Sequence, residues 1–109
     1  MQKIYGTIRK LGVTTRYRGY HFIADAIKFA ITHQHNRIMV TKDIYPYVAR
    51  KYETTDMNVE HSIRIVINAC WTKNKDGFEE IAGYPLKHKP SNSEFIDMIA
   101  YYLSEADDE

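Results

Sequence analysis

Between residues 56 and 72, hydrogen-bonding side chains recur at intervals of three and four residues. At about 100° per residue these positions gather on one side of a helix. Asparagine can pair with adenine through two hydrogen bonds, arginine can pair with guanine, and an apolar side chain can contact the methyl group of thymine. The pattern therefore indicates a helix that reads base edges in the DNA major groove. The residues on this side are Asn58, His61, Ile65 and Asn68, flanked by Met57 and Arg64.

Two features of this side have alternative interpretations. Ile65 is an apolar residue among polar ones, and it can contact either DNA or a neighbouring helix or subunit. Glu60 precedes Arg64 by four residues, which is the spacing of a surface ion pair. Glu60 can also orient Arg64 or accept a hydrogen bond from the amino group of cytosine. Asn58 and His61 lie near the start of the helix, where base contacts are usual.

The opposite side of the same helix is apolar, and it predicts the contact with the core. The segment before it reads as a short helix from Tyr45 or Pro46 to Tyr52, followed by a turn at residues 53–55. Thr55 or Asp56 can cap the second helix. We interpret residues 45–72 as a helix-turn-helix, in which Glu53 takes the place of the usual glycine. The core-facing residues are Val59, Ile63, Val66, Ile67 and Cys70, with Val48 and Ala49 facing them from the first helix.

Three basic residues beside this pair are candidates for contacts with DNA phosphates. They are Lys42, Arg50 and Lys51. Ordinary solvated charge is an equal alternative for each of them. The distribution of charge adds a second indication: residues 1–52 hold ten Lys and Arg against two Asp and Glu, a net +8, whereas residues 53–109 hold five against twelve, a net −7. A basic half suits a phosphate backbone, because neutralised phosphates release counterions.

The remaining segments are also helical in pattern, and only residues 37–41 resemble a strand. Gly12 can close a first helix that carries Ile4, Ile8 and Leu11. A broad apolar face then runs from Phe22 to Ile31, and residues 33–36 end that helix. Residues 73–77 read as a polar loop, followed by a turn of helix at residues 78–82 that Gly83 stops. Ser91 and Glu94 form a capping box for a last helix. The prediction is an all-α fold of five or six helices.

Length and composition indicate one domain over residues 1–109, with an acidic tail at about residues 104–109. The chain is 44% hydrophobic and 27% charged, which is ordinary for a globular protein. No apolar run approaches the roughly 20 residues of a membrane span, and the start has no signal-peptide pattern. A single cysteine, Cys70, fits a reducing compartment. We therefore expect a cytoplasmic protein with no membrane partner.

No motif in the sequence predicts an enzyme, a cofactor or a metal site. The sequence has no nucleophile–base pair and no glycine-rich phosphate loop. Four histidines, His33, His35, His61 and His88, lack the Cys/His spacing of zinc sites. The expected activity is therefore binding.

Several separated motifs, in order, resemble the C-terminal DNA-binding domain of the stage-zero sporulation protein A family. The resemblance covers nearly the whole chain. The longest motif is Ile44 to Thr55, followed by Val59-Glu60, Ile63-Arg64, Ala69-Cys70-Trp71 and the stretch from Lys89 to Ile96.

This resemblance implies a six-helix domain with a helix-turn-helix. Family members are response regulators that bind short DNA boxes, often as tandem copies, and regulate transcription of sporulation genes. The family's arginine and glutamate on the second helix correspond to Arg64 and Glu60. The lysine of its Lys-Pro-(Thr/Ser)-Asn-Ser motif corresponds to Lys89, a candidate backbone or minor-groove contact. No segment supplies the family's phospho-receiver domain, so we expect a stand-alone protein or an excised domain.

The chain departs from the family at the reading positions. The family usually has arginine at the positions of Asn58 and His61, and commonly histidine at that of Ile65. The scaffold is therefore expected to hold, while the preferred DNA sequence stays open. The alternative is a protein-interaction module of the same fold, which would modulate another regulator without binding DNA. The apolar Ile65 and the acidic second half of the chain favour this alternative.

Overall fold

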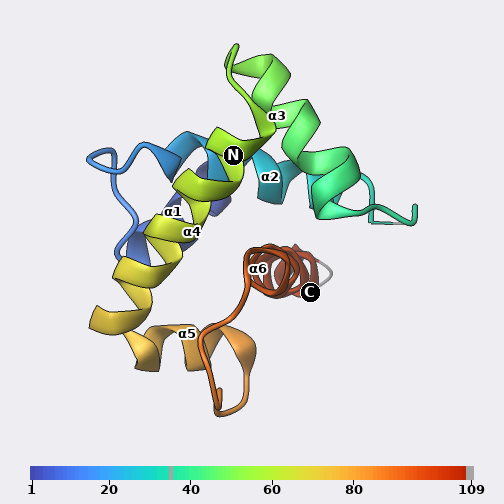
Figure 1. Ribbon diagram of the computed structural model, residues 1–109. Helices are drawn as coiled ribbons and strands as arrows, with labels where there is room; N and C mark the ends of the chain where they lie inside the picture. Colours follow the sequence, from blue (N-terminus) through green and yellow to red (C-terminus); the bar gives the residue numbers. More distant parts are fainter. Residues whose placement is uncertain (35, 108–109) are drawn as a thin grey trace.

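The computed structural model describes residues 1–34 and 36–107, with side chains up to Ser104 (Figure 1). The described residues form six α-helices and one π-helical turn and include no strand, so the predicted all-α class is confirmed. The elements are α1 (Gln2–Lys10), α2 (Gly19–Thr32), η1 (Val40–Ile44), α3 (Tyr45–Lys51), α4 (Asp56–Lys73), α5 (Lys75–Ala82) and α6 (Asn92–Asp107).

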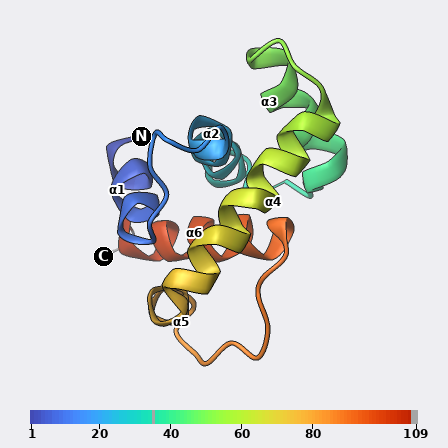
Figure 2. The same ribbon diagram turned by 60° about the vertical axis from the view of Figure 1, so that its left-hand side comes forward.

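One hydrophobic core joins all six helices. Helix α2 lies at its centre, and six consecutive residues from Phe22 to Ile27 are buried there. The apolar face predicted for this helix is therefore confirmed. Figure 2 shows α4 crossing α6, with α1 and α5 beside them. This arrangement leaves one long side of α4 uncovered.

Helix α4 and the short helix before it have the predicted bounds to within two residues. Helix α3 ends at Lys51, and the turn of residues 52–55 leads into α4. The Oγ1 atom of Thr55 accepts a hydrogen bond from the Asn58 backbone N–H at 3.1 Å, so Thr55 is the predicted cap. Glu53 has φ of 52°, the left-handed backbone that favours glycine in such turns. The turn therefore keeps its usual geometry without the usual residue.

The segment after α4 differs from the predicted polar loop. The side chain of Asn74 accepts a hydrogen bond from Gly77 N–H at 3.1 Å, and its amide donates to the Lys10 carbonyl at 3.3 Å. Asn74 is therefore the cap of α5, which begins at Lys75 and is longer than the predicted single turn. Gly83 ends α5 with φ of 85°, as predicted.

The strand-like segment at residues 37–41 forms no strand. The carboxylate of Asp43 accepts a hydrogen bond from Met39 N–H at 2.8 Å, and the backbone N–H of Asp43 donates to the Met39 carbonyl at 2.8 Å. These two bonds coil the chain into η1, which continues directly into α3. Of the residues predicted to end α2, His35 lies outside the described residues.

The predicted capping box begins α6. The Glu94 carboxylate accepts from Ser91 N–H at 2.8 Å, and the Ser91 hydroxyl accepts from Glu94 N–H at 3.1 Å. The helix continues to Asp107, so the expected acidic tail is helical there, and residues 108–109 lie outside the described residues. No described helix is both long enough and apolar enough to cross a membrane.

The capping box should make the stability of α6 depend on pH. Hydrogen bonds from Ser91 hold the pKa of the Glu94 carboxyl below its ordinary value of 4.5. A lowered pKa in the folded state stabilises the fold above about pH 4.5, and this contribution is lost as the pH falls through the folded pKa. Glu94→Gln keeps a capping side chain but cannot titrate. The difference in free energy of unfolding between wild type and Glu94→Gln, measured with urea, should therefore shrink from pH 6 to about pH 3. A difference that is constant with pH would contradict the capping role of the charge.

Candidate nucleic-acid interface

The predicted division of α4 into a core side and an outer side is confirmed. All five residues assigned to the core are at most 2% exposed: Val59, Ile63, Val66, Ile67 and Cys70. On the outer side His61 and Arg64 are exposed, and the apolar Met57 and Ile65 are 80% and 47% exposed. Ile65 is therefore not buried against another described helix. This outer side therefore combines exposed polar residues with exposed apolar ones.

Arg64 is held over the outer side of α4 by two neighbours on the same helix. Its Nε–H donates to the Glu60 carboxylate at 3.0 Å, and an Nη2–H donates to Nδ1 of His61 at 2.9 Å. The pair with Glu60 is exposed, so it contributes only a few tenths of a kcal/mol to stability. Its effect is to orient the guanidinium, whose remaining N–H groups stay available for two-pronged hydrogen bonding.

The two asparagines assigned to the outer side already have partners. The amide of Asn58 donates to the Thr54 hydroxyl at 2.8 Å, within the turn before α4. The amide oxygen of Asn68 accepts a hydrogen bond from the ammonium group of Lys89. The structure therefore groups Glu60, His61 and Arg64, and joins Asn68 to Lys89. Asn58 stands apart from both groups.

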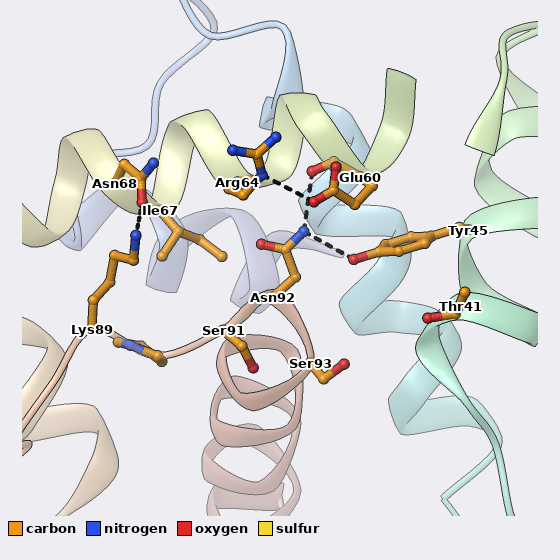
Figure 3. Close-up of a pocket in the computed structure, with 11 residues that line it drawn as sticks. Thr41, Tyr45, Glu60, Arg64, Ile67, Asn68, Lys89, Ser91, Asn92 and Ser93 are labelled. Carbon is orange, nitrogen blue, oxygen red and sulfur yellow. Dashed lines mark hydrogen bonds and ion pairs between the residues drawn. The ribbon is translucent and has the colours of Figure 1, made fainter. Parts of the chain in front are cut away.

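A cleft of about 400 Å³ separates α4 from the chain that enters α6 (Figure 3). Arg64 and Asn68 line it from α4, and Lys89 and Ser91 line it from the opposite wall. The side-chain amide of Asn92 lies between these two walls. The lining thus combines the cationic Arg64 and Lys89 with the carboxylate of Glu60 and with residues that carry hydroxyl groups.

Asn92 connects the starts of α6 and α3 with α4. Its Nδ2 donates to the Tyr45 hydroxyl at 2.9 Å and to the backbone carbonyl of Glu60 at 3.1 Å. Tyr45 is buried, and burial raises the pKa of its phenol. Sequence reasoning missed Asn92 and Tyr45. Helical periodicity does not relate Asn92 to Glu60, which is 32 positions away, or to Tyr45, which is 47 positions away. Their joint effect is to fix α4 relative to α6.

The three basic residues predicted beside the pair of helices have different surroundings. All three, Lys42, Arg50 and Lys51, are exposed. Lys51 donates to the carboxylate of Asp25 at 3.0 Å, and this hydrogen bond raises the pKa of Lys51. Lys42 and Arg50 make no ion pair with the side chains of residues 1–34 or 36–104. Lys51 therefore joins α3 to α2, whereas no described side chain compensates the charges of Lys42 and Arg50.

Asp25 is a third residue that sequence reasoning missed. It is 3% exposed, in the middle of the apolar run of α2, and it also accepts a hydrogen bond from the Tyr52 hydroxyl. Burial first, and then the bond to Asp25, raise the pKa of Tyr52. The sequence did contain a signal for this contact, because Asp25 is an acidic residue within an apolar run. A buried acidic group needs a partner, so a hydrogen bond or an ion pair to Asp25 could have been predicted.

The described residues contain no cluster of three or more His, Cys, Asp and Glu side chains that could hold a metal ion. The arrangement instead offers an exposed helix face with oriented hydrogen-bonding groups and uncompensated cations beside it. The family model described as the C terminus of sporulation initiation factor Spo0A matches residues 4–103 of this chain. The match runs from α1 to α6 and includes every residue of the interface described above.

Proposed function

Because the chain belongs to the family of Spo0A C-terminal domains, which are DNA-binding effector domains, we propose that it is a sequence-specific DNA-binding transcriptional regulator of sporulation type. The observation that supports this proposal best is the outer side of α4, where Glu60 and His61 orient Arg64 on a face that no described element covers. A binding role, and no enzymatic one, follows from this proposal.

In this proposal, α3 and α4 are a helix-turn-helix, and α4 enters the major groove. Arg64 donates to O6 and N7 of a guanine, and Glu60 keeps it in position. Ile65 and Met57 contact thymine methyl groups. His61 accepts from Arg64 through Nδ1, so its Nε2–H is available for a base acceptor. Asn58 and Asn68 reach bases only if they exchange their present partners.

Phosphate contacts come from basic residues around α4. Lys42 and Arg50 lie at η1 and at the end of α3, where the first helix of such a pair crosses the DNA backbone. Lys89 lies on the far wall of the cleft, and Lys51 supports the scaffold through Asp25. Binding of tandem copies to adjacent DNA boxes and a cytoplasmic location belong to the same proposal.

Salt dependence tests the proposal. Duplexes selected by the protein from a random pool should bind with an affinity that falls steeply between about 50 and 200 mM salt. Fluorescence anisotropy with a labelled duplex measures this slope. Failure to retain any duplex even at 50 mM salt would contradict DNA binding.

One observation favours a second candidate, a protein-interaction module. Met57 and Ile65 both expose apolar surface on the outer side of α4, and such surface is also typical of protein interfaces. This candidate predicts no DNA retention at low salt and loss of a protein complex on Ile65→Asp.

A further inference from the structure

Two segments far apart in the sequence contact α4 at nearly the same position along its axis. Asn92, at the start of α6, donates to the backbone carbonyl of Glu60 at 3.1 Å. Gly19, at the start of α2, lies so close to the backbone carbonyl of Ser62 that a Cβ atom on Gly19 would be 2.7 Å from that oxygen. Glu60 and Ser62 immediately precede and follow His61, and each residue turns the helix by about 100°. The two contacts therefore lie on opposite sides of the exposed His61.

The two views of the ribbon agree with this placement, because the starts of α2 and α6 lie on opposite sides of α4 in both (Figures 1 and 2). Cations lie next to each contact. Lys89 is three residues before Asn92 and is exposed. Arg18 directly precedes Gly19, and Arg16 is two residues further back.

Arg16 and Arg18 are exposed and carry uncompensated charge. Neither side chain makes an ion pair or hydrogen bond with the part of the chain that the structure describes. The loop that carries them is ordered by backbone bonds, from Tyr17 N–H to the Thr14 carbonyl and from Tyr20 N–H to the Tyr17 carbonyl, both at 3.1 Å. Two cations without a partner among the described residues are thus carried by an ordered loop, which ends at the residue that contacts α4.

The dimensions of DNA indicate which ligand these cations could bind. An α-helix with its side chains is about 10–12 Å wide, and the major groove is about 12 Å wide. A helix seated in the groove therefore has a phosphate backbone along each side. We propose that Arg16 and Arg18 bind phosphates of one DNA strand while Lys89 binds phosphates of the other, so that α4 is held in the groove from both sides. This inference rests on the proposed function and adds the residues that hold the second strand.

The test uses three variants, Arg16→Gln, Arg18→Gln and the double variant with both substitutions. The control variant is Lys28→Gln. Lys28 is exposed on the same helix as Gly19 but nine residues, about 13.5 Å, further along it, beyond the screening length of about 10 Å at 0.1 M salt. Each substitution removes one positive charge. Arg18 has no side-chain capping bond, so its replacement leaves the start of α2 intact.

Each arginine substitution should lower affinity by about fivefold to tenfold at 0.1 M salt and reduce the slope of log affinity against log salt by about 0.9. The loss should be equal on the selected duplex and on an unrelated duplex, because phosphates carry no sequence information. Lys28→Gln should change neither quantity. In ethylation interference on the selected duplex, Arg16→Gln and Arg18→Gln should abolish the interference at phosphates of one strand. Lys89→Gln should abolish it at phosphates of the other strand.

Two results would overturn the inference while leaving DNA binding in place. In one, the arginine variants behave like Lys28→Gln. In the other, the arginine and Lys89 variants abolish ethylation interference at phosphates of the same strand. If the unsubstituted chain binds no duplex at 50 mM salt, the proposed function falls and this inference with it.

Discussion

Replacing Gly19 by alanine should destabilise the fold by about 1–3 kcal/mol, which is a large part of the stability of a domain of this size. The added methyl group would lie 2.7 Å from the Ser62 carbonyl oxygen and 3.0 Å from Cγ2 of Val66. Because the obstructing oxygen belongs to the backbone of α4, a side-chain rotation cannot relieve the overlap. Thermal unfolding followed by circular dichroism would show a lower midpoint, by about 4–8 °C for each kcal/mol.

Gly6→Ala is the matched control. Gly6 lies in α1, and no heavy atom outside its own helix lies within 4 Å of an added Cβ. The same substitution should therefore stabilise the chain by about 0.5–1 kcal/mol, through the higher helix propensity of alanine. Equal shifts in the two variants would show that α2 does not contact α4 at Gly19, and the placement of α4 would have to be revised.

Arg64→Ala should remove about 1–3 kcal/mol of discrimination at a single base position of the DNA site. Arg64 is the one residue of the outer side with two orienting partners, so it is the best-positioned side chain for a guanine. Competition among duplexes that differ at one base pair each would measure the loss, and the preference should relax at that position only. Arg64→Lys should lose most of the same discrimination, because an ammonium group cannot make the two-pronged contact.

Arg50→Ala is the control for base reading. Arg50 is exposed and makes no ion pair with the side chains of residues 1–34 or 36–104. It lies at the end of α3, where it can contact only the DNA backbone in the proposed complex. Its loss should weaken binding equally for every duplex. Affinities that are unchanged by Arg64→Ala across all sequences would contradict the assignment of Arg64 to a base.

The parts of the fold that depend on local chemistry could be predicted from the sequence. The apolar stripe of α4, the cap at Thr55 and the capping box at Ser91 involve residues at most a few positions apart. The start of α5 was missed because Asn74 reads as a loop residue, and only its bond to Gly77 shows that it caps a helix. The strand-like segment at residues 37–41 was ambiguous, since a strand needs a partner and none exists among the described residues.

The candidate site also has features that could be predicted from the sequence and features that could not. The exposure of Arg64, His61 and Ile65 follows from helical periodicity, so the outer side of α4 could be predicted. The bonds from Lys89 to Asn68 and from Asn92 to Glu60 join residues 21 and 32 positions apart. Such contacts depend on how the helices pack, which single-sequence periodicity does not determine. The ion pair of Lys51 could not be predicted for the same reason, because its partner Asp25 lies 26 positions away.

The most direct test of the central claim, that the outer side of α4 reads DNA, is a map of amide chemical shifts in the full chain titrated with a selected duplex. The largest changes should fall on α4 at Met57, His61, Arg64 and Ile65, with smaller changes at residues 16–18 and 89–93. Changes centred instead on the groove between α5 and α6, where Tyr84 and Tyr101 are exposed, would contradict the claim.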